Sequence, residues 1–397
     1  MKSAPVSAQN RILTIDMIRG FALFGIFLVN MPSFHSPMIQ EIEETGLDFG
    51  LELFFLLFVE GKFYTIFSFL FGLGFYLFMS RAEQKGLRTN HLFARRLAVL
   101  LLIGAAHFIL LWSGDILHTY AVTGFLLLLF YKRKMKTILI WACSLLIVFH
   151  GILIAAFSMP NDTVKELAAT YEQKKAQELP IYLDMYQHAG YLDWVAYRID
   201  TEILIVILQL PLSIIPVLAM FLFGLCAGKL GVFHPNSPHL PLIKKVWSRS
   251  LLVSIPLVVL LAALKLSWID AGLHQDSAGE LFKSLSGVAL CFFYMSSLTL
   301  LLRKRSWQKR LRPLGYAGQM ALTNYLSQTF ICSFLFLVLD FWGKVSLAEG
   351  TLLCLLIYTF QMIFSYFWLQ RFQFGPLEWT WRSLTYGSAQ SMKKENQ

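Results

Sequence analysis

The feature that most constrains this chain is a series of apolar runs of roughly 20 residues. A helix of that length spans the hydrocarbon core of a bilayer. Charged residues make up only 15% of the sequence, against about 25% in ordinary soluble proteins. This composition excludes a disordered chain and argues strongly against a soluble globular enzyme. We therefore predict an all-α, polytopic integral membrane helical bundle.

Ten transmembrane helices account for the apolar runs. The second region, Leu51–Ser80, is longer than one crossing requires and contains Glu60-Gly61-Lys62, so we expect a break there. The segment before the break would lie at the outer surface or re-enter the membrane. The predicted spans are Ile12–Met31, Phe63–Met79, Leu97–Trp112, Ile116–Tyr131, Ile138–Phe157, Ile203–Ala227, Leu251–Leu266, Leu281–Leu302, Leu314–Leu339 and Leu352–Leu369.

The distribution of charge predicts the orientation. If both termini are cytoplasmic, the cytoplasmic segments hold 26 of the 34 Lys and Arg residues but only 4 of the 24 Asp and Glu residues. Basic residues concentrate on the cytoplasmic side of membrane proteins. The net charge of +10 therefore reflects topology, and we expect no nucleic-acid partner.

One long connection divides the chain. Residues 158–201 are polar and mixed in charge, and Val164–Leu179 has the composition of an exposed helix. We predict an N-terminal half of five spans (1–157), this external loop (158–201), a C-terminal half of five spans (202–387) and a cytoplasmic tail (388–397). The halves share no convincing internal repeat, so the pattern does not favour an inverted-repeat transporter.

Familiar catalytic and metal-binding motifs are missing from the sequence. The five cysteines lie in or beside apolar runs and form no CxxC pair, which favours buried, reduced thiols. No P-loop, GxGxxG, GxSxG or paired-cysteine zinc motif occurs, so ATPase, dehydrogenase and serine-hydrolase functions have no support. We predict no metal and no bound cofactor.

Polar residues inside spans are the informative ones, because a charge in the membrane usually has a partner or a function. Asp16 and Arg19 are spaced i,i+3 and can pair, with Asn30 three turns further along the same face. Arg19 either binds an anionic group at the cytoplasmic surface or simply anchors the helix. Glu60 and Lys62 form either a buried pair at the break or, with Glu52, a set of interfacial charges.

A second group lies around the turn between the third and fourth spans. His107, Asp115 and His118 bring two imidazoles and one carboxylate together, and Asp115 and His118 are again i,i+3. An imidazole with a carboxylate partner is a plausible general base. The alternative is a histidine that bonds a neighbouring helix, which is also our interpretation of His150. Asn324 and Gln328, at i,i+4, favour interhelical hydrogen bonding.

Several motifs resemble the YeiB-like bacterial membrane proteins, also called domain of unknown function 418. The resemblance runs from Arg11 to about Tyr386. Its motifs are Asp16–Gly25 with Asn30, Gly61–Phe63, Phe67–Gly72, Gly114–Leu117 with Tyr120, Leu322–Leu326 and Gly375–Arg382. The resemblance implies a multi-pass protein of the bacterial plasma membrane.

That family is similar, more distantly, to transmembrane acyltransferases, which include the acyltransferase-3 and heparan glucosaminide N-acetyltransferase families. Those proteins take an acyl group from acyl-CoA at the cytoplasmic face and deliver it to an outer acceptor. The acyltransferase-3 pattern has an Arg near the start of the first span and a His 11 residues later. Arg19 matches the Arg, but Asn30 stands at the His position, and an amide cannot act as a general base. His107 is the substitute that we predict.

The resemblance thus implies acyl transfer to an extracytoplasmic or lipid-linked acceptor, with acyl-CoA as donor and a glycan or lipid as acceptor. Arg19 and Lys62 would hold anionic groups, and His107 with Asp115 would move protons. Two alternatives remain. The same polar residues would serve a transporter or channel for a small solute or lipid, or the chain would be a structural or signalling membrane protein.

Overall fold

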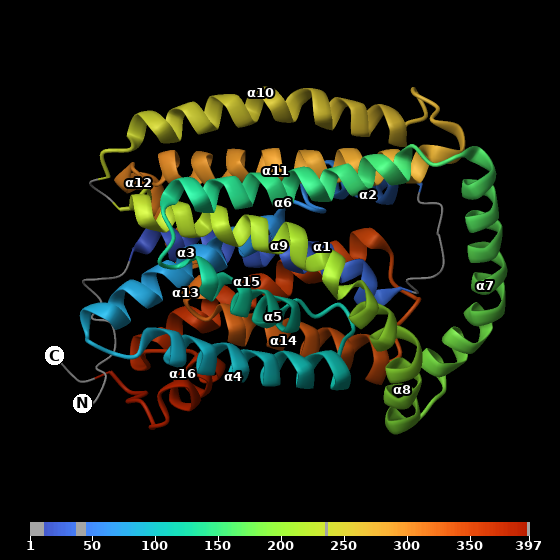
Figure 1. Ribbon diagram of the computed structural model, residues 1–397. Coiled ribbons are helices and arrows are strands. Elements are labelled where there is room, and N and C mark those ends of the chain that lie inside the picture. The colour runs from blue at the N-terminus through green and yellow to red at the C-terminus, as the bar shows by residue number, and fades with distance from the viewer. Residues whose placement is uncertain (1–11, 37–44, 235–236, 395–397) are drawn as a thin grey trace.

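The computed structural model describes residues 12–36, 45–234 and 237–394. Within these ranges the chain is a bundle of helices (Figure 1), and the single extended pairing is an antiparallel bridge between Phe372 and Lys393. Nine of the described helical stretches are long and apolar enough to cross a membrane. The predicted all-α, multi-pass class is confirmed.

The helices have the following bounds in chain order: α1 (Leu13–His35), α2 (Gly46–Phe58), α3 (Phe63–Gln84), α4 (Thr89–Leu110), α5 (Leu117–Leu127), α6 (Met135–Phe157), α7 (Asn161–Gln187), α8 (Tyr191–Arg198), α9 (Leu204–Leu230), α10 (Leu240–Lys265), α11 (Gln275–Leu301), α12 (Arg305–Arg310), α13 (Arg312–Gln319), α14 (Ala321–Ser333), α15 (Leu347–Arg371) and α16 (Pro376–Tyr386). Short 3₁₀ turns at Leu128–Phe130 and Gly272–His274 and π-helical turns at Ile199–Ile203 and Phe334–Val338 complete them.

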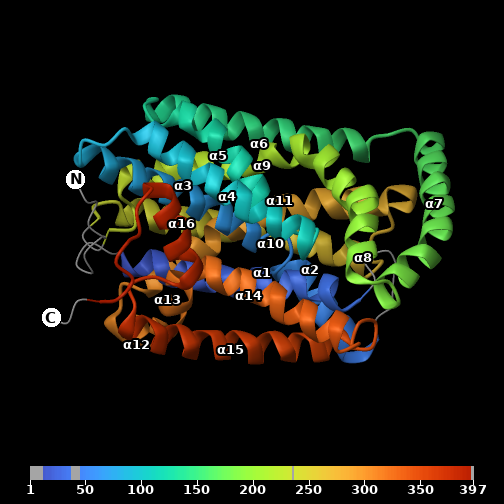
Figure 2. The same ribbon diagram turned by 90° about the horizontal axis from the view of Figure 1, so that it is seen from below.

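The long helices lie side by side, and shorter helices close the two ends of the bundle. Helix α7 crosses one end, with α8 beside it, whereas α12, α13 and α16 gather at the opposite end with the start of α1 (Figures 1 and 2). The charge pattern predicts that this second end, which carries both described chain ends, is cytoplasmic. We call it the basic end and the end covered by α7 the α7 end.

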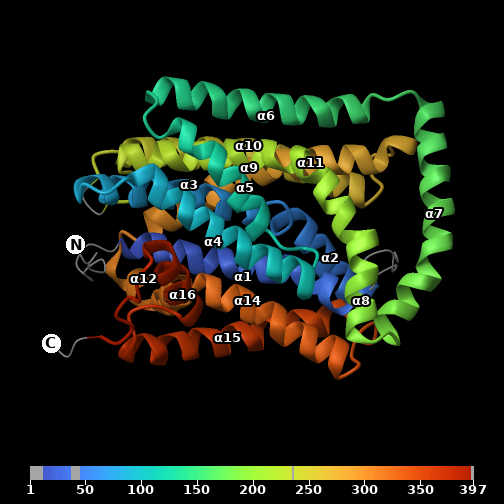
Figure 3. The same cartoon turned by 60° about the horizontal axis from the view of Figure 1, so that its bottom comes forward.

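Burial differs strongly among the spanning helices. Of the most apolar window of α1, 61% is buried inside the bundle, against 11% for α6. Helix α6 runs along the edge of the bundle, as Figure 3 shows. In a bilayer the apolar side chains of α6 would face lipid, because a helix that is hydrophobic all round needs no protein cover there.

Glycines allow α3 and α9 to pack closely in the centre. A Cβ atom at Gly72 would lie 1.9 Å from the carbonyl oxygen of Phe221, and one at Gly224 would lie 1.9 Å from that of Phe69. Only glycine permits this approach of the two backbones, which is a common way to associate helices in membranes.

The predicted break in the second region is confirmed. Helix α2 ends at Phe58 and α3 begins at Phe63, with turns between them. The predicted fourth span is shorter than expected, because α5 and its 3₁₀ extension cover only Leu117–Phe130. Together with the nine longer stretches it gives the ten apolar segments that the sequence predicts.

Two predictions are corrected. The ninth span does not run unbroken from Leu314, because α13 ends at Gln319 and α14 starts at Ala321. The carboxylate of Glu378 accepts hydrogen bonds from the Leu322 and Thr323 N–H groups and so caps the new helix. Among the five free cysteines, Cys143 on α6 is exposed rather than buried.

The connection between the halves contains the predicted exposed helix. Helix α7 is longer than the Val164–Leu179 stretch and is exposed over most of its length. Its last turns pack inward, where the Tyr186 ring stacks on Trp342 with centroids 5.1 Å apart. Helix α8 continues from there into the π-helical turn before α9.

Candidate functional site

A cavity of about 1020 Å³ opens among the helices at the basic end. Its volume is at the upper limit of ordinary small-molecule sites. The walls come from the first half of α1, from α3, α4 and α5, from the end of α9, and from α13, α14 and α16. The cavity therefore joins segments from both halves of the sequence.

The cavity is amphipathic. Six cationic side chains line it against two carboxylates, Asp16 and Glu378, and the cations are Arg19, Arg81, Lys85, Arg96, Lys229 and Arg382. Its remaining walls include an apolar set of Ile26, Phe67, Leu70, Leu97, Leu100, Ile116 and Leu117. Such walls suit a ligand that has an anionic group and a hydrocarbon portion.

The predicted pair of Asp16 and Arg19 is confirmed and lines this cavity. Arg19 Nη1 donates to Asp16 Oδ1 at 2.9 Å and to the Gly318 carbonyl at 3.3 Å. Asp16 Oδ2 is buried and has no hydrogen-bond partner among the described residues. The pair thus keeps an unused acceptor, and the Arg19 side chain stays 28% exposed.

Glu378 is structurally engaged. Its carboxylate accepts from the backbone of Leu322 and Thr323 at 2.7 and 3.1 Å and from the Thr323 hydroxyl at 2.5 Å. Burial raises the pKa of this carboxyl despite those hydrogen bonds. Its role in capping α14 leaves the cavity with little negative charge to balance its cations.

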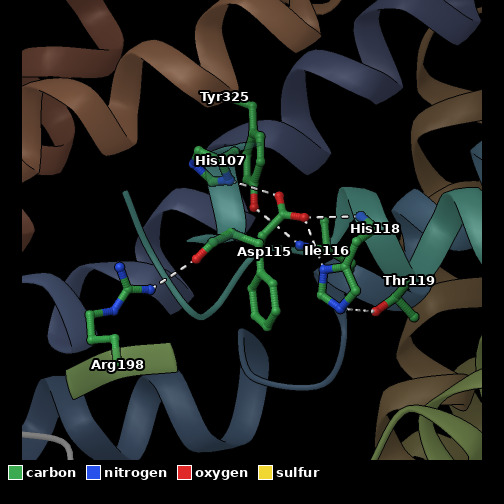
Figure 4. A network of polar contacts seen from close by, with 8 residues as sticks. His107, Asp115, Ile116, His118, Thr119, Arg198 and Tyr325 are labelled. Carbon is green, nitrogen blue, oxygen red and sulfur yellow. Dashed lines mark hydrogen bonds and ion pairs between the residues drawn. The ribbon is translucent and has the colours of Figure 1, made fainter. Parts of the chain in front are cut away.

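His107, Asp115 and His118 meet in one buried cluster, as predicted (Figure 4). His107 Nδ1 lies 2.8 Å from Asp115 Oδ1, and Asp115 Oδ2 accepts from the His118 N–H at 2.9 Å. His118 Nδ1 is 3.1 Å from the same oxygen, and its Nε2 faces the Thr119 hydroxyl at 3.2 Å. The turn after α4 brings the two histidines to one carboxylate.

The electrostatics of this cluster favour an ionised Asp115. Burial raises the pKa of Asp115, but the hydrogen bonds from His107 and His118 together outweigh it, and the net pKa is lowered. A carboxylate can only accept, so Nδ1 of neutral His107 carries the proton and Nε2 carries the lone pair. His107 Nε2 is buried and has no partner among the described residues.

Tyr325 connects this cluster with the cavity. Its ring packs against the His107 ring with centroids 5.5 Å apart, and its hydroxyl accepts from the Ile116 N–H at 3.4 Å. The hydroxyl points toward Asp115 (Figure 4). Tyr325 and Ile116 both line the cavity, whereas His107 does not. One layer of side chains therefore separates the cavity from the imidazole.

Comparison with known proteins places this architecture in a family. The family model "Protein of unknown function (DUF418)" matches residues 227–388. "Uncharacterized protein YxaH" of Bacillus subtilis (strain 168) is 34% identical, and the alignment covers 98% of both chains. "Uncharacterized protein YeiB" of Escherichia coli (strain K12) is 26% identical over 96% of this chain and 98% of its own length. The chain belongs to the DUF418 family.

In this DUF418 protein, the matched segment supplies α16 and one wall of the cavity, including Glu378 and Arg382. Arg19, Arg96 and the histidine cluster lie outside that segment but inside the region aligned with the YxaH and YeiB proteins. The site therefore combines residues inside the matched segment with residues outside it.

Lys62 does not join Arg19 at the cavity of this DUF418 protein. It is fully buried at the break before α3, where its Nζ donates to the Leu56 carbonyl at 2.8 Å and so caps the end of α2. The predicted direct pair of Lys62 with Glu60 is wrong. Glu60 pairs instead with Lys283, whose Nζ lies 3.9 Å from Glu60 Oε2. Glu52 pairs with Lys265 on α10 at 2.6 Å.

The other amides act between helices. Gln328 donates to Gln361 on α15 at 2.9 Å, and Asn324 donates to Ser365 at 3.1 Å, which confirms the interhelical interpretation. Asn30 lies on α1 away from the cavity lining. His150 lies 2.8 Å from the Leu146 carbonyl and 3.2 Å from Ser284, also between helices.

Sequence reasoning missed Arg198, which holds the end of the His107 helix. This arginine is fully buried and donates to the Phe108 and Ile109 carbonyls of α4 at 3.0 and 3.2 Å. It also pairs with Glu202 at 3.1 Å. Figure 4 shows it beside the cluster. Arg198 belongs to the predicted external loop, and only its position before an acidic residue at i,i+4 hinted at a role.

Proposed function

We propose that this protein binds an anionic amphiphile at the cytoplasmic end of the bundle and transfers its acyl group to an acceptor hydroxyl. It would act as a multi-pass protein of the bacterial plasma membrane, in keeping with its bacterial relatives. The observation that carries the proposal is the amphipathic cavity, whose inner wall of Ile116 and Tyr325 adjoins the His107 cluster. Acyl-CoA has the anionic and hydrocarbon portions that such a cavity suits.

In this proposal His107 is the general base. Asp115 fixes its tautomer and leaves Nε2 to take the proton of an acceptor hydroxyl, the arrangement used by catalytic triads. This step requires the Tyr325 ring, which lies between His107 and the cavity, to move aside. The acceptor oxygen then forms a bond to the acyl carbonyl carbon while the carbon–sulfur bond to the thiol breaks. The imidazolium returns its proton to the departing thiolate. The acceptor would be an extracytoplasmic or lipid-linked hydroxyl, and no resident cofactor is needed.

The test is thioester turnover by purified protein. Octanoyl-CoA should be hydrolysed slowly without acceptor, because water can replace the hydroxyl. His107→Gln should slow turnover by roughly 100-fold or more, the usual contribution of a general base, with binding unchanged. Asp115→Asn should cost less, since it orients the base. His150→Gln, which alters a histidine between α6 and α11, is the matched control.

Two outcomes would contradict this function. If His107→Gln lowers thermal stability but leaves specific activity unchanged, the histidine is structural. If octanoyl-CoA does not bind while proteoliposomes show solute flux, the transporter alternative replaces acyl transfer. That alternative needs a second opening at the α7 end, where the buried side chains of Arg198, Trp194 and Trp112 now pack together.

A further inference from the structure

Guanidinium groups from three distant parts of the chain converge on the cavity. Arg19 comes from α1, Arg96 from α4 and Arg382 from α16, and all three line it. Arg19 and Arg382 are close enough to act electrostatically on Arg96. The positive charges of neighbouring guanidinium groups repel one another. A polyvalent anion bound between these groups would offset that repulsion.

Arg96 is held in place without an acidic partner. Its guanidinium carbon lies 3.5 Å from the centroid of the Trp381 ring and 5.2 Å from that of Phe78. The Trp381 indole N–H donates to the Arg96 carbonyl at 2.9 Å, which fixes α16 against α4. Among the described residues, the Arg96 guanidinium forms neither an ion pair nor a hydrogen bond.

The two carboxylates of the cavity do not neutralise Arg96. Glu378 is engaged by Leu322 and Thr323, and Asp16 uses Oδ1 for Arg19. The planar fork of a stacked guanidinium keeps its N–H donors directed in one plane, and that geometry matches a phosphate or carboxylate. Several guanidinium groups lining one cavity favour the anion with more charge and more acceptor oxygens, which is phosphate.

We infer that the anionic group bound in this cavity is a phosphate ester, gripped by Arg96 with Arg19 and Arg382 around it. The inference rests on the proposed amphiphile site and names its ligand class. The phosphate belongs either to a phosphorylated acyl thioester or to a phospholipid headgroup. Trp381 acts here as a positioning residue, because its ring and its indole N–H hold the Arg96 side chain and backbone in place.

Binding of matched probes to the full-length protein in detergent tests this inference. Octanoyl-CoA and S-octanoyl pantetheine share the acyl chain and thioester, but the second lacks phosphate. The phosphorylated probe should bind roughly 10- to 100-fold more tightly, the range expected for charge-assisted hydrogen bonds. Phosphatidylglycerol against diacylglycerol forms the lipid pair, and the pair with the larger difference identifies the source of the phosphate.

Variants tie that difference to the arginine. Arg96→Gln should remove most of the preference for phosphate, and Arg96→Lys should restore only part of it, because an ammonium lacks the planar fork. Trp381→Phe keeps an aromatic face but loses the hydrogen bond to the Arg96 carbonyl. It should weaken the binding of the phosphorylated probe and leave the binding of the other probe unchanged. Arg95→Gln, at the preceding residue of α4 and outside the cavity lining, is the control and should leave the binding of both probes unchanged.

The outcomes separate this inference from the proposed function. Equal binding of octanoyl-CoA and S-octanoyl pantetheine overturns the phosphate assignment while leaving an amphiphile site intact. Failure of all four probes to bind overturns both. If the Arg96→Gln protein unfolds, Arg96→Lys and Trp381→Phe are tested in its place. If both variants keep the full preference for the phosphorylated probe, the inference is also overturned.

Discussion

Arg96 and Arg198 both stack on a tryptophan, but they lie near opposite ends of α4 and differ in their hydrogen-bond partners. The Arg198 guanidinium is 4.5 Å from the Trp194 ring and also binds Glu202 and two carbonyls. Within the described part of the chain, the Arg96 guanidinium contacts aromatic rings but forms no ion pair or hydrogen bond, and Arg96 lines the cavity. A buried arginine whose three nitrogens each donate a hydrogen bond stabilises the fold. An arginine held against aromatic rings, without a hydrogen bond to the described residues, is available to a ligand.

The same difference separates the two ends of the bundle. At the α7 end, Arg198 and Glu202 form an ion pair. The small space there is lined by residues that include Trp112, Trp194 and Trp342. At the basic end, six cations surround about 1020 Å³ of space. The histidine cluster lies between these two environments, adjacent to the cavity through Tyr325 and to Arg198 through α4.

The largest expected effect is an all-or-none result on which end faces the cytoplasm. Reporter fusions after Lys136 and after Arg312 should score cytoplasmic, and one within Lys165–Lys175 should score external. The positive-inside rule is the reason. An external score at Arg312 would reverse the two ends and place the basic cavity on the outer face.

Arg198→Met should cause the largest loss of stability. Removing one partner of a buried ion pair typically costs about 3–5 kcal/mol, because the groups left behind lose their compensation. Here these groups are Glu202 and the carbonyls of Phe108 and Ile109. Denaturation of the purified protein in mixed detergent micelles measures the loss. Arg95→Met is the control. A loss below 1 kcal/mol for Arg198→Met would mean that Arg198 does not differ from Arg96 in its contribution to stability.

Arg96→Met should cost far less. It removes a cation–π contact worth about 0.5–1 kcal/mol and breaks no ion pair. It also relieves repulsion from Arg19 and Arg382. The same denaturation assay, run beside Arg198→Met, should separate the two arginines by at least about 2 kcal/mol. Equal losses would mean that Arg96 is structural and would weaken its assignment to a ligand.

The smallest effect is expected between α14 and α15, away from either end. Gln328→Leu removes one donor to Gln361, whose own amide still donates to the Asn324 carbonyl and the Ser327 hydroxyl. Interhelical hydrogen bonds in membrane proteins average about 0.6 kcal/mol. A denaturation shift of that size would calibrate the comparison, and a loss above 2 kcal/mol would indicate a more tightly coupled network.

Features governed by local spacing could be predicted from the sequence. The break at Glu60–Lys62, the Asp16–Arg19 pair and the Asp115–His118 contact each depend on charge or on i,i+3 geometry. Lys62 was predicted to hold an anionic group, but it does not line the cavity. Its amine donates to the Leu56 carbonyl instead, and the sequence alone does not reveal this contact.

Features that depend on packing between distant segments could not be predicted. The Trp381 and Arg96 contact joins residues 285 positions apart, and no periodicity signals which helix α16 meets. Arg198 was hidden in a polar segment that was predicted to lie outside the membrane. The start of α14 was misplaced because its cap, Glu378, lies 55 residues beyond Thr323 in the sequence.

The bond from Arg198 to α4 also has a consequence for biogenesis. The Phe108 carbonyl is synthesised 90 residues before the arginine that caps it. At translation rates of about 5–20 residues per second, α4 waits roughly 5–20 s for this partner. During that interval the His107 turn must satisfy its last carbonyls with water, the translocation machinery or neighbouring spans. The histidine site is therefore completed only after the ribosome has synthesised Arg198.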